Sequence, residues 1–549
     1  MNFDPILPSA RVTAMRRQGH WRDRVLTEYL DEAIARNPDK IALVDHNSVT
    51  GERTELTFAE LGRRVEQIAL GLVALGVQKA DVVSYQLPNW WQFTALHLAC
   101  LRIGAVTNPL MPIFRQRELE FMLGLAEARV LVVPRVFRGF DYPAMIEDIR
   151  GKLPALQHVL VIGGEGEASF ERRMLGKQAH GDAAKLFAAR KPAPDEVIQV
   201  LYTSGTTGEP KGVMHTANTL FSNILPYAER LGLGAADVAL MASPMAHQTG
   251  FMYGLMMPVT LGAKAVLQDI WHPGEAASII AAEGVTFTMA STPFLADLTE
   301  TAIKRPKDVA SLRIFLSAGA PIPRVLVQRA KEALGAEIVS AWGMTENGAV
   351  TTTKVGDKPD KTFGTDGLAL PGMETRTVDA DDKPVAVGEE GRLQTRGCSN
   401  FVGYLKRPQL YGTDADGWFE TGDLARIDAD GYIRITGRAK DIIIRGGENV
   451  PVVEVEQLMY RHPAVQEVAI VAMPDERLGE RGCAFVVLRA GKSLDFREML
   501  TFLSEQKLAK NYFPERLQIV EQMPKTPSGK IQKFKLRDVA KSLTPETVR

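Results

Sequence analysis

The sequence predicts an α/β protein: a large N-terminal domain of βα sheets with a small β-rich subdomain, followed by a small mobile α+β domain at the C-terminus. Three observations predict this class. Strand-like and helix-like segments alternate over the first third of the 549 residues and again over residues 263–338. Short strands with frequent glycines begin near Gly364, and a compact mixed segment follows Gly437. At roughly 150 residues per domain, the length allows three or four structural units.

The first helix of this alternation follows a capping box formed by Thr57 and Glu60. Apolar residues recur at spacings of three and four from Phe58 to Leu72, which predicts a helix with one buried face. The next segments are predicted as strand, helix, strand, helix and strand, over residues 82–87, 91–101, 105–108, 117–126 and 130–133. This alternation predicts βαβ units and a largely parallel sheet.

In the later part of the chain the pattern of predicted secondary structure changes twice. A surface connection at residues 191–194 precedes a strand at 197–202, and a second βα series covers 263–338. Short strands such as 391–395 then predict the β-rich subdomain. Beyond residue 437 we expect strands at 468–472, 484–488 and 517–520 around a helix at 496–503. We therefore divide the chain into a body, residues 1–437, and a cap domain, residues 438–549.

Composition excludes several classes of protein. Hydrophobic residues make up 45% and charged residues 24% of the chain, as in ordinary globular proteins. The net charge of −1 argues against a global surface for nucleic acid or anionic membrane. Cys100, Cys398 and Cys483 lack disulfide or metal spacing. The N-terminus lacks a signal peptide's apolar region, and no run of about 18 apolar residues occurs. We expect a cytoplasmic protein without a transmembrane segment.

The most informative segment is TSGTTGEPKG, residues 203–212, directly after a predicted strand. It is not a Walker A loop, because Pro210 stands where that motif needs glycine, and Gly212 stands where it needs Ser or Thr. The alternative is a flexible turn rich in turn-forming residues. The hydroxyl groups, flexible backbone and cation that predict a polyphosphate site belong to Thr203, Ser204, Gly205, Thr206, Thr207 and Lys211.

Six further motifs follow this loop in order. They are SPMAH (243–247), SAGAP (317–321), WGMTE (342–346), TGD (421–423), GRAKD (437–441) and PKTPSGK (524–530). Together with YTSGTTGEPKG they resemble the signature of the adenylate-forming superfamily, which comprises acyl-CoA synthetases, luciferases and nonribosomal peptide adenylation domains. The resemblance implies an enzyme that uses ATP, Mg²⁺ and coenzyme A.

The same resemblance assigns an ATP site. Glu346, with Thr206, would hold Mg²⁺, a cation that prefers oxygen ligands. Thr345 would contact the α-phosphate, and Asp423 would accept the ribose hydroxyls. Trp342 would stack on adenine. The complete set outside the loop is Gly319, Ala320, Pro321, Ser340, Ala341, Trp342, Gly343, Thr345, Asp423 and Arg438.

Residues near the C-terminus would carry the remaining steps. Lys530 resembles the lysine that bridges the attacking carboxylate and the α-phosphate, where negative charge builds up in the transition state. After acyl-AMP forms, the resemblance implies rotation of the cap domain about a hinge at Lys440, so that CoA attacks to give the thioester and AMP. The CoA-facing loop is predicted from Arg445, Gly446, Gly447 and Glu448.

The acyl group is predicted from the residues around SPMAH. His247, the third predicted catalytic residue beside Lys530 and Glu346, would close the acyl pocket. The lining is predicted from His247, Gln248, Gly250, Met252, Ala318, Gly319, Met344 and Val350. This set has no Arg or Lys for a second carboxylate and no Asp for an amino group, so we expect a medium-size monocarboxylic acid.

Several alternatives stay open at this point. In overall texture the chain most resembles bacterial cyclohexanecarboxylate-CoA ligases and short- to medium-chain fatty acyl-CoA synthetases. The other hypotheses are an aromatic acid-CoA ligase, an acyl-AMP ligase that loads a carrier protein, a luciferase-type oxidase and a catalytically inactive scaffold protein. Residues 524–533 also resemble the recognition pattern of lysine acetyltransferases, so an acetyltransferase and a deacetylase acting on Lys530 are expected partners. We expect a monomer or homodimer that binds no nucleic acid.

Overall fold

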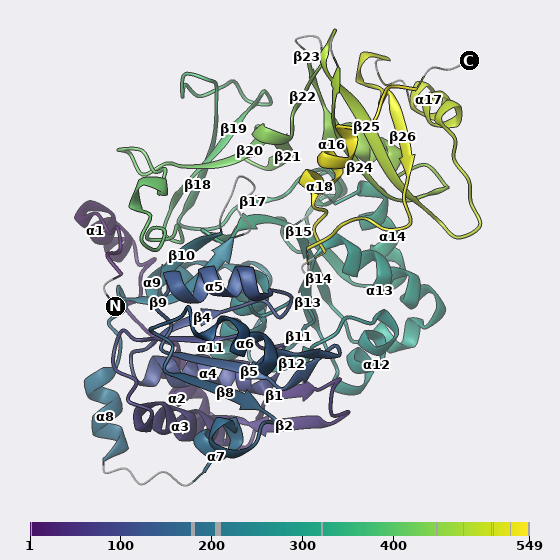
Figure 1. The fold of residues 1–549 in the computed structure, drawn as a ribbon. Coiled ribbons are helices and arrows are strands. Elements are labelled where there is room, and N and C mark those ends of the chain that lie inside the picture. Colours follow the sequence, from purple (N-terminus) through teal and green to yellow (C-terminus); the bar gives the residue numbers. More distant parts are fainter. Residues whose placement is uncertain are drawn as a thin grey trace.

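The computed structural model describes residues 1–546 except 2, 177–181, 204–209, 320–321, 446–447, 476, 507, 509 and 527–528. The side chains of residues 440, 448 and 449 are likewise not described. Figure 1 shows two packed sheets in the lower part of the molecule, with a small antiparallel sheet and the C-terminal unit above them. No helix in the described part of the chain is long and apolar enough to cross a membrane.

The larger of the two central sheets has nine strands in the order β17-β16-β15-β14-β13-β11-β12-β1-β2. The run from β15 to β1 is parallel, whereas β2, β16 and β17 are antiparallel edges. The strands are β1 (Ile41–His46), β2 (Arg53–Thr57), β11 (Val238–Met241), β12 (Lys264–Gln268), β13 (Phe287–Ala290), β14 (Ile314–Ala318), β15 (Glu337–Met344), β16 (Gly348–Thr352) and β17 (Leu368–Ala369).

The second sheet has six strands in the order β10-β9-β4-β3-β5-β8 and is parallel except for the hairpin of β9 and β10. Its strands are β3 (Val82–Tyr85), β4 (Val106–Pro109), β5 (Val130–Pro134), β8 (His158–Ile162), β9 (Val197–Thr203) and β10 (Lys211–Thr216). A two-stranded ribbon, β6 (Val136–Phe137) and β7 (Phe140–Asp141), follows β5.

Helices fill three layers around these sheets. The largest apolar core lies between the sheets and includes α2 (Leu26–Arg36), α3 (Phe58–Ala74), α4 (Trp91–Arg102), α9 (Ala217–Arg230) and α11 (Met257–Leu261). The six-stranded sheet packs its outer face on α5 (Gln116–Leu125) and α6 (Tyr142–Arg150). The nine-stranded sheet packs its outer face on α12 (Pro273–Glu283), α13 (Thr292–Lys304) and α14 (Arg324–Leu334). The body is therefore a five-layer α/β sandwich (Figure 1).

The two upper units are β-rich. The small sheet is antiparallel, in the order β18 (Met373–Val378), β19 (Glu390–Gly397), β20 (Phe419–Ile427), β21 (Ile433–Arg438). The C-terminal unit joins β22 (Ile443–Arg445), β23 (Glu448–Val450), β24 (Val465–Asp475), β25 (Gly479–Leu488) and β26 (Arg516–Ile519) to α16 (Val452–Met459), α17 (Phe496–Glu505) and α18 (Lys533–Ala540). Its two apolar clusters contain only residues beyond 440. The division at residue 437 stays a prediction.

The predicted fold class is confirmed, as are the elements predicted before residue 134. Thr57 Oγ1 accepts from the Glu60 amide, and the Glu60 carboxylate accepts from the Thr57 amide, so the capping box is formed. The predicted strands and helix of the C-terminal unit are also present. The sequence analysis missed α1 (Ser9–Arg17), α2 and β1, and it did not separate the strands into two sheets.

A buried carboxylate, Asp45 on β1, gives this fold a pH-dependent stability. The side chain is 1% exposed, and only one of its oxygens accepts a hydrogen bond, from the Trp91 amide at 3.0 Å. Burial, with Asp269 nearby, raises the pKa of Asp45 to about 7. The unfolded chain has an ordinary aspartate pKa of about 3.9. Between these values the folded state holds the extra proton, so the unfolding free energy falls as pH rises, by up to about 1.4 kcal/mol per pH unit.

We expect Asp45→Asn to remove this dependence, because the amide oxygen still accepts from Trp91 but does not titrate. The variant should gain stability over the wild type as pH rises from 5.5 to 8, by about 2 kcal/mol. Thermal unfolding at both pH values measures the gain. Asp141→Asn is the control, since Asp141 likewise accepts from an amide in the first turn of a helix, that of Ala144 in α6, but lies on the surface. An equal gain in both variants would contradict the assignment.

Candidate active site

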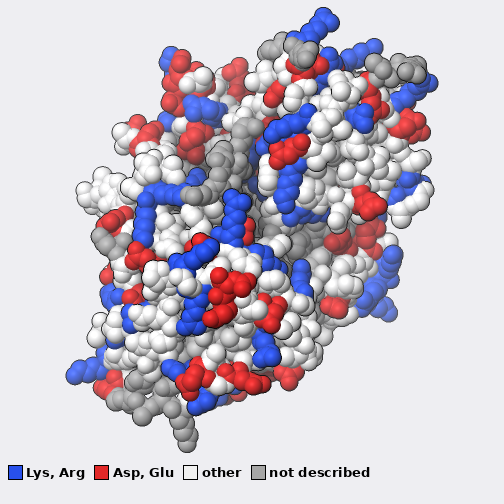
Figure 2. All heavy atoms as spheres, in the orientation of Figure 1, with Lys and Arg blue, Asp and Glu red and all other residues white. Residues whose placement is uncertain are grey.

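Several predicted site residues lie at the carboxyl ends of two neighbouring parallel strands of the nine-stranded sheet, β14 and β15. Ser317 and Ala318 on β14 are in register with Ser340 and Ala341 on β15. In open α/β sheets this edge is where ligands bind. Gly319 has φ +82°, so the chain turns sharply after β14. Figure 2 shows Lys and Arg side chains on both sides of the hollow between the lower body and the upper units, a suitable approach for polyanions.

Some predicted residues lie outside the described part of the chain. They are Ser204, Gly205, Thr206, Thr207, Ala320, Pro321, Gly446 and Gly447, together with the side chains of Lys440 and Glu448. Thr203 ends β9 and Lys211 begins β10, and the two residues are paired across the hairpin. The hairpin therefore holds both ends of the predicted phosphate loop.

Glu346 is a buried carboxylate with the properties of a cation ligand. Its side chain is 4% exposed, and among the described residues it forms no ion pair. The Tyr404 hydroxyl donates to Oε1 at 2.8 Å, and the Glu346 carbonyl oxygen accepts from the Phe401 amide at 2.7 Å. Burial raises the pKa of Glu346 above its ordinary value, although Tyr404 and Lys211 partly offset this. Because a buried charge needs compensation, this carboxylate fits Mg²⁺.

Tyr404 is a site residue that the sequence analysis missed. Besides its bond to Glu346, its ring lies 4.5 Å from Lys211 Nζ, and its hydroxyl is 3.4 Å from that ammonium. Tyr404 thus joins the predicted metal ligand to the predicted phosphate-loop cation. The residue follows a glycine in an ordinary loop, so no periodicity or charge pattern marks it.

Two predicted nucleotide residues converge on a third, Asp423, which is 5% exposed on β20. Trp342 Nε1 donates to Oδ2 at 2.9 Å, and Arg438 Nε lies 2.9 Å from Oδ1. Trp342 itself is 8% exposed and belongs to an apolar cluster that also contains Trp21 and Val350. The indole therefore orients the carboxylate, a role the sequence did not indicate. Stacking of Trp342 on adenine stays a prediction, as does a place for Val350 in the acyl pocket.

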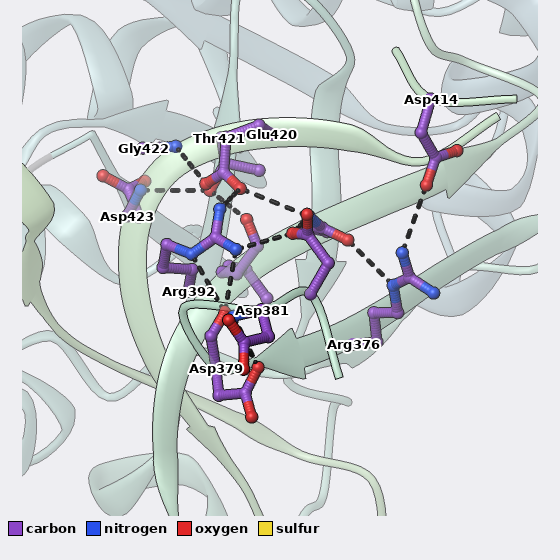
Figure 3. Close-up of polar contacts among 12 residues, drawn as sticks. Arg376, Asp379, Asp381, Arg392, Asp414, Glu420, Thr421, Gly422 and Asp423 are labelled. Carbon is purple, nitrogen blue, oxygen red and sulfur yellow. Dashed lines mark hydrogen bonds and ion pairs between the residues drawn. The ribbon is translucent and has the colours of Figure 1, made fainter. Parts of the chain in front are cut away.

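An ion-pair network on the small sheet fixes the strand that carries Asp423. Figure 3 shows Arg392 between the carboxylate of Glu420 and the backbone of Asp379, with Asp423 three residues farther along β20. Arg392 lies 2.8 Å from Glu420 and 2.6 Å from Asp382. Glu420 is thus neutralised within the sheet, whereas Asp423 projects toward Trp342 and Arg438.

His247 precedes the short helix α10 (Gln248–Gly250) at the entrance to the predicted acyl pocket. Its Nδ1 accepts from the Thr249 amide at 3.3 Å, so the neutral ring carries its proton on Nε2. Burial, with the Lys530 ammonium nearby, lowers the pKa of His247 to about 4. At neutral pH His247 is therefore an uncharged hydrogen-bond donor and not a general base.

The next residues form the predicted wall of the acyl pocket. Gln248 is 3% exposed, and neither atom of its amide has a hydrogen-bond partner within the described part of the structure. Gly250 is required sterically, because a Cβ there would lie 2.3 Å from the Pro244 carbonyl oxygen. Met252 is buried in the π-helical segment η2 (Phe251–Met256). π-helical turns are frequent at functional sites.

The C-terminal unit brings Lys530 to the same place. A Cβ on Gly529 would lie 2.8 Å from Ser291 Oγ and 3.4 Å from the Pro293 ring, at the start of α13. The backbone of Lys530 turns back on Thr526 through two hydrogen bonds, of 2.7 and 3.1 Å. The structure thus brings together the predicted catalytic residues 247 and 530, which are 283 positions apart in the chain.

Arg445, predicted to face CoA after rotation of the cap domain, forms an ion pair within the C-terminal unit in this conformation. Its guanidinium lies 2.9 Å from Glu515, which also pairs with Arg481. At the predicted hinge, Lys440 lies in the single turn η5 (Ala439–Asp441), and Asp441 pairs with Arg537. Arg445 thus belongs to an ion-pair cluster with Glu515 and Arg481, and its place beside CoA stays a prediction.

Comparison with known proteins identifies the family. Residues 30–405 match the family model described as AMP-binding enzyme, and residues 454–530 match the model of the AMP-binding enzyme C-terminal domain. The chain belongs to this family. It is an adenylate-forming acyl-CoA ligase, an enzyme that uses ATP, Mg²⁺ and coenzyme A.

Individual relatives differ in the acids they are named for. The chain is 38% identical over 540 residues to a medium-chain fatty-acid–CoA ligase of Escherichia coli (strain K12), covering 98% of this chain and 94% of that protein. It is 34% identical over 543 residues to a salicylyl-CoA synthase / salicylate adenylyltransferase of Streptomyces sp, covering 97% of each. An anthranilate CoA ligase in complex with anthranoyl-AMP superposes with a TM-score of 0.84 at 28% identity, covering 94% and 98% of the two chains.

Proposed function

We propose that this enzyme activates a medium-size monocarboxylic acid, such as an alicyclic or short- to medium-chain fatty acid, and transfers the acyl group to CoA. The carboxylate attacks the α-phosphorus of ATP and pyrophosphate leaves; the CoA sulfur then attacks the acyl carbon and AMP leaves. The observation that carries the proposal is the convergence of Lys530, His247 and the apolar pocket wall at one place. The similarity to a medium-chain fatty-acid–CoA ligase supports the substrate class.

Each residue contributes a separate element of the adenylation step. Asp423, oriented by Trp342 and Arg438, would accept the ribose hydroxyls. Glu346 would hold Mg²⁺, which supplies positive charge to the phosphates. His247, with its proton on Nε2, would donate to the substrate carboxylate. The Lys530 ammonium would stabilise the charge shared between carboxylate and α-phosphate. The thioester step would then follow rotation of residues 438–549 about Lys440, presenting the loop at Arg445 to 448.

Pyrophosphate release over a panel of acids tests this proposal. Butanoate, octanoate, cyclohexanecarboxylate, benzoate and salicylate should be compared, with thioester formation followed on addition of CoA. We expect the greatest kcat/KM for octanoate or cyclohexanecarboxylate. Release confined to aromatic acids would overturn the substrate class, and thioester formation that requires a carrier protein would overturn the acceptor.

A hydroxylated aromatic acid is the second candidate, and one observation favours it. The unpartnered amide of buried Gln248 would stay unpaired against an alkyl chain, which is unfavourable, whereas an ortho-hydroxyl group could bond to it. The salicylate-specific name of one relative agrees with this candidate. The ratio of salicylate to octanoate turnover, measured before and after Gln248→Leu, separates the two candidates: a fall in the ratio supports the aromatic acid.

We also propose that Lys530 is a site of reversible acetylation, since neutralising its charge would remove its contribution to adenylation. Mass spectrometry of the protein after incubation with acetyl-CoA and a lysine acetyltransferase tests this modification. The monomeric or homodimeric state and the cytoplasmic location stay predictions.

Trp342→Phe should weaken ATP binding specifically. The phenyl ring keeps most of the apolar packing but loses the hydrogen bond to Asp423, so the carboxylate proposed to hold the ribose is less well oriented. Since hydrogen bonds to charged groups contribute about 1.5–3 kcal/mol, we expect the KM for ATP to rise roughly tenfold or more. Initial-rate kinetics at saturating acid measure it.

Trp21→Phe is the matched control for this substitution. Trp21 lies in the same apolar cluster and loses an equivalent bond, from Nε1 to the Cys398 carbonyl oxygen at 3.0 Å. It should lower stability without changing the KM for ATP. Equal increases of KM in both variants would show that general packing, and not the orientation of Asp423, is responsible.

A further inference from the structure

A buried polar pair, Asn223 on α9 and Tyr253 on η2, lies between the predicted acyl pocket and the ATP-binding turn. Both residues are 1% exposed. The Tyr253 hydroxyl donates to Asn223 Oδ1 at 2.6 Å and accepts from the Ala349 amide at 2.9 Å. Asn223 Nδ2 donates to the Ala349 carbonyl oxygen at 2.8 Å and to that of Asn347 at 3.3 Å.

Tyr253 connects this pair to the predicted wall of the acyl pocket. Tyr253 comes directly after Met252 in η2, and Gly250 is the last residue of α10, which η2 continues without a break. Gly250 is pressed against the Pro244 backbone. The predicted pocket wall and Tyr253 are therefore joined through one continuous, closely packed segment.

Both residues of the pair also contact the turn that carries Thr345 and Glu346. Besides the bonds from Asn223, this turn is held by His215, whose Nε2 lies 2.8 Å from the Thr345 carbonyl oxygen, and by the Met344 amide, which donates to Asn347 Oδ1 at 3.1 Å. Hydrogen bonds thus hold the backbone of the turn on both sides of Glu346.

The turn also has little room to move. A Cβ on Gly343 would lie 1.8 Å from the Gly348 carbonyl oxygen, and a Cβ on Gly348, where φ is +68°, would lie 3.0 Å from the Asn223 amide. Close-packed segments of this kind shift together and do not deform gradually.

We propose that Asn223 and Tyr253 are positioning residues that couple acyl-pocket occupancy to the binding of MgATP. The inference rests on the proposed roles of Gly250 and Met252 in the pocket and of Thr345 and Glu346 at the nucleotide. By linkage the coupling is reciprocal: the acid tightens nucleotide binding by the same factor as the nucleotide tightens acid binding.

Calorimetric titration of α,β-methylene-ATP with MgCl₂, in the absence and presence of saturating octanoate or salicylate, tests the coupling. In the wild type we expect the acid to tighten nucleotide binding about tenfold, within the usual 5- to 150-fold range of coupling between sites. Tyr253→Phe, which leaves the Ala349 amide and Asn223 Oδ1 unpaired, should reduce this factor below about 2 and weaken nucleotide binding alone about tenfold.

Tyr227→Phe is the matched control. Tyr227 stacks on Tyr253 with ring centroids 4.3 Å apart, and its hydroxyl contacts Met289 Sδ instead of the turn. This variant should keep the wild-type coupling factor. If both variants lose it equally, the effect comes from aromatic packing and the proposal is overturned.

Hydrogen exchange of wild-type residues 343–350 gives a second measurement that needs no variant. Acid alone, without nucleotide, should slow their exchange; unchanged exchange with a bound acid would overturn the proposal.

Failure of the proposed function is distinct, because it would appear as no pyrophosphate release with any acid of the panel. The nucleotide-only comparison of Tyr253→Phe with Tyr227→Phe still decides the positioning role in that case: equal affinities overturn it.

Discussion

Replacement of Lys530 by alanine should slow acyl-adenylate formation by about two to three orders of magnitude, the usual cost of removing one preorganised donor at a developing charge. In the structure the turn that carries Lys530 packs against Ser291 and Pro293, and its ammonium influences the titration of His247. The carboxylate and the α-phosphate are both anions, so a cation placed between them stabilises the transition state more than either separate ligand.

The measurement separates the two half-reactions. Pyrophosphate release from ATP and octanoate reports adenylation, whereas thioester formation from presynthesised octanoyl-AMP and CoA reports the second step. We expect Lys530→Ala to lose adenylation and to keep thioester formation close to the wild-type rate. Once pyrophosphate has left, the carboxylate and the α-phosphate are already joined in acyl-AMP, and no cation is needed to bring the two anions together.

Lys535→Ala is the matched control, since Lys535 is an exposed lysine of the same basic segment. It should leave both half-reactions unchanged. Equal loss of adenylation and thioester formation in Lys530→Ala would mean that the substitution disturbs the whole C-terminal unit and would contradict the proposed role.

Local patterns predicted the elements of the fold but not their assembly. The helix at Phe58–Ala74 could be predicted because a capping box and an apolar stripe both lie within a few turns of sequence. The pairing of β1 with β12 could not, because residues such as Leu43 and Ala265 meet only through the tertiary fold. The division into two sheets depends on such long-range pairings.

The candidate site divides in the same way. Residues that belong to recognisable motifs, such as Asp423 and Lys530, could be predicted from their neighbours in sequence. Tyr404, Tyr253 and Asn223 could not, because each acts through a single buried hydrogen-bonding group in a segment whose pattern indicates only packing.

Arg11 is the clearest example of a residue whose role emerges only from the fold. Its guanidinium is buried and donates to carbonyl oxygens of Gly397, Asn400 and Phe401, nearly 400 positions away. Phe401 in turn donates its amide to the Glu346 carbonyl oxygen. In the sequence, the arginines of the N-terminal stretch indicated only the absence of a signal peptide's apolar region.

Glu346→Gln should produce the second large effect, a loss of about 10²- to 10³-fold in kcat/KM, because charge stabilisation at the phosphates depends on a correctly placed Mg²⁺. The glutamine amide can still pair with Tyr404 but cannot neutralise a divalent cation. Pyrophosphate release over a range of Mg²⁺ concentrations should show a lower rate at saturating Mg²⁺ and a much higher half-saturating Mg²⁺ concentration. Glu283→Gln, the same change in a buried glutamate of α12 that pairs with Arg53 and Lys264, should leave both unchanged.

The raised pKa of Glu346 predicts how the stabilisation of the enzyme by Mg²⁺ depends on pH. Without metal the folded state holds a proton on this carboxyl group at pH values where the unfolded chain, with a glutamate pKa of about 4.3, has released it. The unfolding free energy of the metal-free enzyme therefore falls as pH rises through this window, and Mg²⁺ restores it by binding the carboxylate. The Mg²⁺-induced increase in Tm should grow with pH in the wild type and should be absent in Glu346→Gln. An equal, pH-dependent increase in the variant would show that Mg²⁺ binds elsewhere and would remove Glu346 from the metal site.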